Sequence, residues 1–279
     1  MKQFFLFLLA FCEDSAFAQS PFDSTIYGRN EEAGKWADVR GVKMYYETYG
    51  QGETLLIIHG NGGSINNFLY QIPYFEKNYK MIIADSRGHG KTLDKGDSLT
   101  YEMMADDYAA LLDLLKIDSA NVIGWSDGGI NGLLLAMRHP GKVKKLAVTG
   151  ANLSPDTAAV HPFAFNWAQN YNKNLAKQAQ NDTVKAMRKQ ARLLSFEPHI
   201  NPTDLKSIKC PTLVISGDQE VILAKHTLFI AQNIPKANLW IVPNSGHSVP
   251  ITYKDEFNVR VDRFFKTPYK KIGAFGLFE

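Results

Sequence analysis

The sequence contains little cysteine, no long apolar run and no block of like charge. Two cysteines, Cys12 and Cys210, occur among 279 residues, so a disulfide framework is not expected. The formal net charge is +3 and the basic residues are dispersed, which argues against a nucleic-acid partner. The apolar run at residues 4–11 is far too short to cross a bilayer, so we expect no membrane span.

Motifs for metals and cofactors are also missing from the sequence. The histidines are scattered without an H-E-x-x-H pair, and no cysteine pair has the spacing of metal ligands. The glycine-rich segment "HGNGG" at residues 59–63 lacks the lysine of a phosphate-binding P-loop, and no dinucleotide-binding fingerprint occurs. We therefore expect no metal site and a protein that works without a cofactor.

The first 18 residues have the layout of a secretory signal peptide. Lys2 precedes the apolar run at residues 4–11, and the small residues Ala16 and Ala18 stand at the two positions that a signal peptidase inspects. Cleavage after Ala18 would give an exported protein, either periplasmic or secreted.

Two alternatives for this segment remain open. Lipidation at Cys12 is disfavoured by the bulky Phe11 before it, where a small residue is wanted. Glu13 and Asp14 lie unusually close to the apolar run and favour an uncleaved segment. If residues 1–18 are removed, Cys210 is the remaining cysteine and no internal disulfide can form.

Short apolar runs recur along the rest of the chain and alternate with helical patterns. Continuous apolar strands separated by helices are typical of a parallel sheet that is covered on both faces. The sequence therefore predicts an α/β fold with a mostly parallel sheet in one domain. The predicted buried strands lie at residues 55–58, 81–84, 121–123, 146–148, 212–215 and 239–242.

A long excursion between two of these strands interrupts the alternation. Residues 151–205 contain two helical patterns, one of which places Trp167, Tyr171 and Leu175 on one stripe. An insertion of this length is more typical of a helical lid than of a loop. The predicted organisation is a signal peptide at 1–18, an N-terminal arm at 19–35, a core at 36–150 and 206–279, and a helical lid at 151–205.

Polar residues follow the predicted strands, at the sheet edge where ligands bind in open α/β folds. The segment "GWSDGG" at residues 124–129 places Ser126 on a tight turn between a buried strand and a buried helix. Backbone strain at a polar residue indicates function. Asp218 and Glu220 follow the strand at 212–215, and His247 follows the strand at 239–242.

The segment at residues 124–128 fits the G-x-S-x-G nucleophile elbow, and an acid and a histidine follow in the same order. The chain therefore resembles the α/β-hydrolase superfamily over residues 36–266, and within it the valacyclovir-hydrolase-like esterases and related bacterial hydrolases. The resemblance implies a serine hydrolase that cleaves ester or amide bonds of small substrates. Ser126 would be the nucleophile that carries the acyl group, and His247 the base that activates it.

The acid of the triad has two candidates. In the resembling family the orienting aspartate stands three residues after a glycine, and counting from Gly217 gives Glu220. A glutamate can accept the imidazole N–H bond as an aspartate does. Asp218 has the usual side chain but arrives earlier in the loop, so we favour Glu220 and keep Asp218 as the alternative.

The oxyanion hole is expected to consist of two backbone N–H groups. The first belongs to Asp127, which follows the nucleophile. The second belongs to the loop after the strand at 55–58, where Asn61 is the candidate. Gly60, Gly62 and Gly63 give that loop its freedom to turn toward the substrate.

The Asp127 side chain has two interpretations. Its carboxylate offsets the positive end of the following helix, or it faces the pocket and binds a substrate ammonium group, as the resembling enzymes do with an aspartate at this place. The other predicted substrate-binding residues are the aromatic side chains beside the nucleophile and in the lid, namely Trp125, Phe163, Phe165 and Trp167.

Other functions remain possible with the same residues. Carbon–carbon bond hydrolases and perhydrolases use the same triad, and the fold can also serve as a ligand receptor without turnover. Serine at position 126 disfavours haloalkane dehalogenase and epoxide hydrolase chemistry, for which the family places an aspartate there. The expected partner is a small-molecule substrate.

Overall fold

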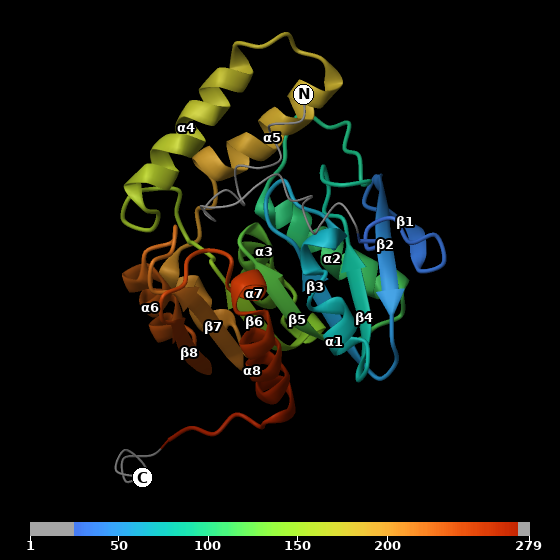
Figure 1. Cartoon of the computed structure of the whole chain (residues 1–279), viewed down its shortest axis with the longest axis vertical. Helices are drawn as coiled ribbons and strands as arrows, with labels where there is room; N and C mark the ends of the chain where they lie inside the picture. Colours follow the sequence, from blue (N-terminus) through green and yellow to red (C-terminus); the bar gives the residue numbers. More distant parts are fainter. Residues whose placement is uncertain (1–24, 273–279) are drawn as a thin grey trace, which may run out of the picture.

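The fold is built on one sheet with helices on both faces, as the sequence predicted (Figure 1). The computed structural model describes residues 25–272. The predicted signal peptide at residues 1–18 lies outside them. The strand order is β1-β2-β4-β3-β5-β6-β7-β8. The pairs β1–β2 and β2–β4 are antiparallel, and every later pair is parallel.

Each of the six predicted buried strands lies within a described strand, and the described residues form further elements that the sequence analysis did not predict. The strands are β1 (Gly34–Val39), β2 (Val42–Tyr49), β3 (Glu53–Ile58), β4 (Tyr79–Ala84), β5 (Ala120–Trp125), β6 (Val143–Thr149), β7 (Thr212–Gly217) and β8 (Ala237–Val242). The helices are η1 (Ile65–Phe68), α1 (Ile72–Phe75), α2 (Tyr101–Leu114), α3 (Asp127–Arg138), η2 (Pro140–Lys142), α4 (Pro162–Ala176), α5 (Asp182–Phe196), η3 (Pro202–Ser207), α6 (Ala224–Asn233), α7 (Val249–Thr252) and α8 (Lys254–Lys266).

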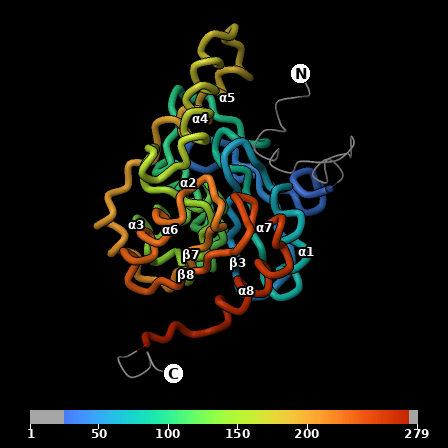
Figure 2. The backbone as a smooth tube through the Cα atoms, turned by 60° about the vertical axis from the view of Figure 1, so that its left-hand side comes forward, coloured from blue at the N-terminus to red at the C-terminus, as the bar shows by residue number. Residues whose placement is uncertain are grey.

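The central strands are buried because helices cover both faces of the sheet. Alternate residues of a strand point to opposite faces: Leu56 and Ile58 of β3 pack into one core with α2, α3 and α6, whereas Leu55 and Ile57 pack into a second core with α1 and α8. Figure 2 shows these two helix layers on either side of the strands. The rigid sheet therefore fixes the loops that follow its strands.

Helices α4 and α5 form a helical insertion that projects from the sheet-and-helix body (Figure 1). They pack on each other around a small core of Leu175, Val184 and Ala191. The insertion falls inside the segment 151–205 for which the sequence predicted a helical lid. The residue before α4 is hydrogen-bonded to the loop after β7: the His161 N–H donates to the Val221 carbonyl at 2.7 Å.

The described part of the N-terminal arm is bound to β2. The Gly28 and Asn30 N–H groups donate to the buried Glu47 carboxylate at 2.9 and 3.0 Å. The hydroxyls of Tyr45 and Tyr49 donate to the same carboxylate, both at 2.7 Å. A buried carboxylate with four donors is well satisfied, so this contact anchors the arm.

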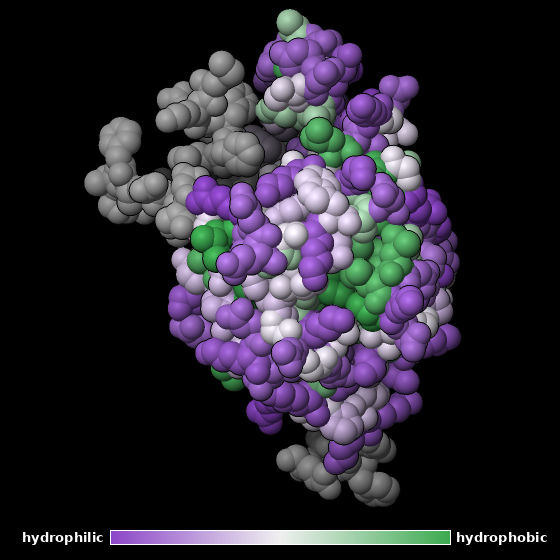
Figure 3. All heavy atoms as spheres, turned by 90° about the vertical axis from the view of Figure 1, so that its right-hand side faces the viewer, coloured by the Kyte–Doolittle hydropathy of each residue, from purple (hydrophilic) through white to green (hydrophobic). Residues whose placement is uncertain are grey.

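The face that Figure 3 presents is largely hydrophilic, with one larger apolar area and smaller apolar spots elsewhere. Within residues 25–272, no helix combines the length and apolar character needed to cross a bilayer. The same residues include no cluster of three or more histidine, cysteine or acidic side chains that could hold a metal ion.

Candidate active site

Ser126 stands on the sharp turn that the sequence predicted between β5 and α3. Its φ and ψ are 58° and −122°, a conformation that non-glycine residues seldom adopt. Two glycines allow this turn to sit against the sheet. A Cβ on Gly124 would lie 2.1 Å from the Gly128 carbonyl oxygen, and one on Gly128 would lie 2.0 Å from that of Ile58. The turn therefore holds Ser126 at the carboxyl edge of the sheet.

The structure brings Ser126, His247 and Glu220 into one hydrogen-bonded chain. His247 Nε2 lies 2.9 Å from Ser126 Oγ, and His247 Nδ1 forms a hydrogen bond with Glu220 Oε1. The Glu220 side chain is fully buried, and Oε1 also accepts from the Val221 N–H at 3.1 Å. With Nδ1 protonated toward Glu220, Nε2 is free to accept the serine proton.

Asp218 lies outside this chain. One of its carboxylate oxygens accepts a hydrogen bond from the Ser245 backbone N–H at 3.1 Å, across to the loop that carries His247. An aspartate that caps a neighbouring loop in this way supports loop geometry. Of the two predicted acids, the structure places Glu220 against the imidazole.

The environment of His247 favours a basic imidazole. Burial acts to lower its pKa, but the Glu220 carboxylate, with a smaller contribution from Asp127, raises the pKa above its ordinary value. The pairing therefore stabilises the imidazolium that forms when the ring accepts a proton.

Two contacts that the sequence analysis missed hold the imidazole in place. The Trp125 indole N–H donates to the His247 backbone carbonyl at 2.9 Å. Gly150 follows β6 with a φ of 65°, and a Cβ there would lie 2.8 Å from Cε1 of the ring. A glycine two residues after the predicted strand at 146–148 was the available signal. Trp125 therefore supports the histidine loop, and its role in substrate binding stays a prediction.

The loop after β3 places its backbone beside the nucleophile. A Cβ on Gly60 would lie 3.0 Å from the Cβ of Ser126. His59 fixes the start of this loop, because Nδ1 bonds the Gly60 carbonyl at 2.7 Å and Nε2 accepts from the Ser86 N–H at 2.9 Å. Burial, with a smaller effect of the neighbouring His89, lowers the pKa of His59 to about 3, so the ring is neutral at physiological pH.

The two predicted oxyanion donors belong to loops that meet at Ser126. No residue from 25 to 272 accepts a hydrogen bond from the backbone N–H of Asn61 or of Asp127. Unpaired N–H groups beside a nucleophile are the arrangement that a developing oxyanion requires.

The Asp127 carboxylate is buried and its hydrogen-bond partners are neutral, while the nearby His247 acts on it electrostatically. Asn61 Nδ2 donates to its Oδ2 at 2.8 Å, and the Tyr101 hydroxyl is a second partner. Burial raises the pKa of Asp127 to about 6, although both hydrogen bonds oppose that shift. Among the described residues no lysine, arginine or histidine forms an ion pair with it. Tyr101 was missed because it comes from α2, and no sequence spacing links it to the elbow.

The three lid aromatic residues that were predicted to bind substrate, Phe163, Phe165 and Trp167, lie in the first half of α4. Phe163 is 61% exposed, whereas Phe165 and Trp167 are half-buried. Trp167 stacks on Tyr171 with ring centroids 5.2 Å apart. Their role in substrate binding stays a prediction.

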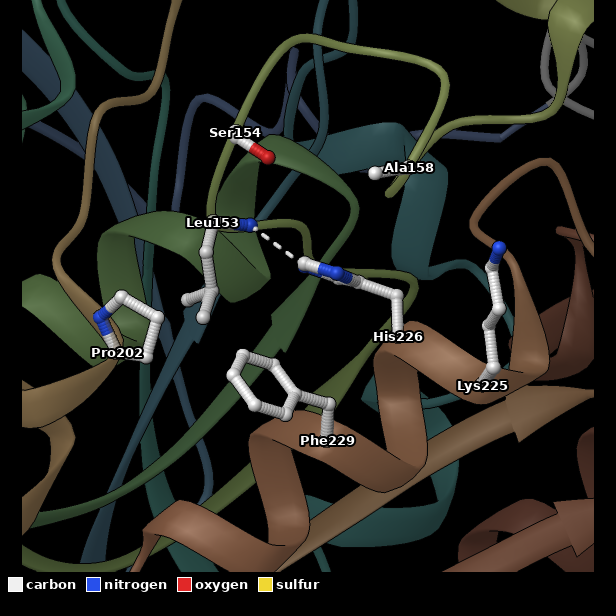
Figure 4. A pocket seen from close by; sticks show the side chains of 7 residues that line it. All are labelled: Leu153, Ser154, Ala158, Pro202, Lys225, His226 and Phe229. Carbon is white, nitrogen blue, oxygen red and sulfur yellow. Dashed lines mark hydrogen bonds between the residues drawn. The ribbon is translucent and has the colours of Figure 1, made fainter.

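A surface hollow of about 340 Å³ lies between the loop after β6 and helix α6 (Figure 4). His226 is fixed at its wall, because Nε2 accepts from the Leu153 N–H at 3.0 Å. None of the residues that line the hollow belongs to the Ser126–His247–Glu220 chain. They are Leu153, Ser154, Ala158, Pro202, Lys225, His226 and Phe229.

Comparisons with known proteins agree with this geometry. Residues 53–186 match the family model described as alpha/beta hydrolase fold. The chain is 26% identical over 249 residues to serine hydrolase BPHL of Mus musculus, covering 82% of this chain and 84% of that protein. It is 28% identical over 258 residues to RutD of Caulobacter sp. (strain K31), covering 79% of this chain and 95% of that protein.

A solved structure confirms the fold. The enol-lactonase of Burkholderia xenovorans LB400 superposes with a TM-score of 0.71 at 21% identity, covering 84% of this chain and all of that one. The protein is a hydrolase, and its fold is the α/β-hydrolase fold.

Proposed function

We propose that this hydrolase is a cofactor-free serine hydrolase that cleaves ester or amide bonds of small molecules through an acyl-enzyme on Ser126. The observation that carries the proposal is the hydrogen-bonded chain from Ser126 Oγ through His247 to Glu220. The similarity to a protein named as a serine hydrolase supports it over most of the chain.

The geometry suggests how each residue acts. His247 Nε2 takes the proton from Ser126 as Oγ attacks the substrate carbonyl carbon. The backbone N–H groups of Asn61 and Asp127 stabilise the oxyanion of the tetrahedral intermediate. The protonated His247, stabilised by Glu220, then gives its proton to the leaving group. Water repeats these steps on the acyl-enzyme, and the acid product leaves.

Other reactions with the same triad predict different products. A carbon–carbon hydrolase would release an acid from a diketone, a perhydrolase would form a peracid, and a ligand receptor would not turn over. Rapid mixing with a chromogenic short-chain ester separates the enzyme from the receptor. We expect chromophore release with a burst proportional to enzyme or a steady rate above background; binding without release would contradict the proposal.

Asp127 favours substrates with an amine. Its carboxylate lies one residue from the nucleophile, is 3% exposed, and has neutral donors as its described partners. A substrate ammonium would give this buried charge an ion-pair partner. The test compares an amino acid ester with its des-amino analogue in the wild type and in Asp127→Ala. A kcat/KM ratio near one, or a ratio that the substitution leaves unchanged, would show that Asp127 does not select amines.

A further inference from the structure

The side chain of Asn61 lies between the elbow and the helical insertion. One amide group makes two hydrogen bonds: Asn61 Nδ2 donates to Asp127 Oδ2 at 2.8 Å and to the backbone carbonyl of Gln190 in α5 at 3.1 Å. A side-chain amide nitrogen has two hydrogens to donate, so both are used. The residue whose N–H is a predicted oxyanion donor is therefore also a contact of α5.

The same turn of α5 is fixed to the loop after β4. Gln190 Nε2 donates to the Gly88 carbonyl at 2.7 Å. Lys189 Nζ lies 2.6 Å from Asp94 Oδ2, and it donates to the carbonyls of Asp94 and Gly96, both at 2.8 Å. The Lys189 and Asp94 side chains are 11% and 5% exposed. Because breaking a buried pair leaves an uncompensated charge, this contact holds α5 firmly on the core.

Asp94 is in turn tied to the body of the protein. Arg87 Nη1 lies 3.4 Å from Asp94 Oδ1, and Arg87 binds both carboxylate oxygens of Asp107 in α2 at 2.6 and 2.8 Å. The Asp107 side chain is fully buried. Lys189 therefore docks on a loop that has its own ion pair to the body, so we expect a change at Lys189 to act mainly on α5.

Apart from Asn61, two side chains restrain the loop that carries it at its ends: His59 Nδ1 bonds the Gly60 carbonyl at 2.7 Å, and Asn67 Oδ1 accepts from the Ser64 N–H at 2.7 Å. Gly60, Gly62 and Gly63 surround Asn61, Gly62 has a φ of 64°, and a Cβ on Gly62 would meet no atom within 4 Å. One backbone turn, from the Gly63 N–H to the Gly60 carbonyl at 3.2 Å, closes the loop. The Gly60 carbonyl shares a peptide plane with the Asn61 N–H, so the two hydrogen bonds to that carbonyl and the contacts of the Asn61 side chain together set the direction of the N–H.

From these contacts we propose that the Asn61 side chain is a positioning residue that makes the aim of its own backbone N–H depend on the docking of α5. While α5 is docked on the core, its Gln190 carbonyl holds the side-chain amide of Asn61. The held side chain in turn keeps the loop that carries Asn61 close to Ser126. When α5 lifts, Asn61 loses its bond to Gln190 and the N–H loses its alignment. The inference rests on the proposed acyl-enzyme mechanism for its catalytic consequence.

A double-mutant cycle in steady-state hydrolysis of a chromogenic ester tests this coupling. We expect Asn61→Ala to lower kcat about 10- to 100-fold, the effect of losing or misplacing one oxyanion donor, with KM changed by less than about threefold. Lys189→Met is expected to lower kcat about fivefold in the wild-type background and less than about twofold in the Asn61→Ala background.

Two variants serve as matched controls. Asn66→Ala removes an asparagine near the same loop, whose Oδ1 accepts from Ser64 Oγ. Lys185→Met removes an exposed lysine one turn earlier in α5. Both should leave kcat unchanged. Equal effects of Lys189→Met in the two backgrounds, or an Asn61→Ala change confined to KM, would overturn the proposal.

Hydrogen exchange measures the coupling without reference to catalysis. We expect faster amide exchange at residues 59–64 in Lys189→Met than in Lys185→Met, and unchanged exchange there overturns the coupling. Because this comparison uses only the two lysine variants, it tests the coupling even if Asn61→Ala does not fold. Failure of the proposed function has a separate signature, because Ser126→Ala would then keep its activity whatever the exchange experiment shows.

Discussion

The Glu220 carboxylate is the acidic group that touches the imidazole of His247, although a sequence-based choice between it and Asp218 was open. A glutamate is one methylene longer than the usual aspartate. Here the added length is accommodated because the Glu220 side chain is fully buried and a backbone N–H holds the same oxygen. The arrangement fixes the imidazole tautomer that catalysis needs.

Glu220→Gln should therefore lower kcat by roughly 10²- to 10⁴-fold, because an amide cannot stabilise the imidazolium and can favour the wrong tautomer. Asp218→Asn, the matched control, should cost less than about tenfold. Steady-state kinetics on one ester compares the two. A larger loss for Asp218→Asn would give the orienting role to that residue.

The pH profile of the Glu220→Gln variant gives a second readout. His247 must be neutral to accept the serine proton, so kcat/KM falls as pH drops through its pKa. Burial lowers that pKa, and the Glu220 carboxylate reverses the effect and raises it. The acid limb of the variant should thus lie at lower pH than that of the wild type. An unmoved limb would show that Glu220 does not set this pKa.

Asp127→Asn should stabilise the protein at high pH. The folded protein binds the Asp127 proton more tightly than the unfolded chain, because burial raises the pKa from 3.8 to about 6. Stability is therefore lost as pH rises through this window and stays lost above it. Asparagine cannot ionise, so its gain should be on the order of 1–3 kcal/mol at pH 8. Urea unfolding at pH 8 and pH 4 measures this, and a gap that fails to close at pH 4 would contradict it.

At the scale of elements, the site depends on how closely α3 approaches β3. The approach is possible because Gly128 has no side chain where the Ile58 carbonyl passes. This close approach requires a strained backbone conformation at Ser126. The flanking glycines and the hydrogen bond from the Ser126 N–H to the Thr149 carbonyl, at 2.8 Å, stabilise the turn.

Gly128→Ala should lower the free energy of unfolding by about 1–3 kcal/mol, because the new Cβ would overlap backbone atoms that cannot move aside. Gly141→Ala is the control, since a Cβ there meets nothing within 4 Å. Denaturant unfolding followed by circular dichroism compares the two. Equal stability of both variants would mean that α3 has room to shift.

Which elements could be predicted follows from how each is buried. The central parallel strands were predicted because burial on both faces makes them continuously apolar, and the edge strand β8 was predicted from its apolar residues 239–242 although Leu239 is 41% exposed. Strand β1 was not, since it is an edge strand whose Trp36 is 53% exposed and whose pattern has no clear period. Short α1 and α7 have four residues each, too few for a helical repeat to show.

The residues of the candidate site were also predictable only where their positions leave a pattern in the sequence. Ser126, Glu220 and His247 were predictable together because the carboxyl ends of neighbouring parallel strands meet at one edge. Tyr101 and Gln190 were not, because each reaches the site from a helix whose docking is set by tertiary packing. Sequence reasoning assigned Asn61 for its backbone N–H and gave no role to its side chain.

At the scale of the whole molecule, we propose that the protein is exported. The proposal rests on the sequence of residues 1–18, where an apolar run is followed by small residues at the two positions that a signal peptidase inspects; these residues lie outside the described part of the chain. Protein purified from the native cell should begin at Gln19. N-terminal sequencing that finds Met1 on protein from the cytoplasm would contradict export.

The central claim is that hydrolysis proceeds through an acyl-enzyme on Ser126, and this intermediate can be detected directly. Intact-protein mass spectrometry after brief mixing with an activated ester, followed by peptide mapping, tests it directly. The account predicts one acyl group per chain on Ser126, no adduct in Ser126→Ala, and loss of nearly all turnover in that variant with its fold retained. Turnover by Ser126→Ala above a few per cent of the wild-type kcat, in protein free of other esterases, would contradict it.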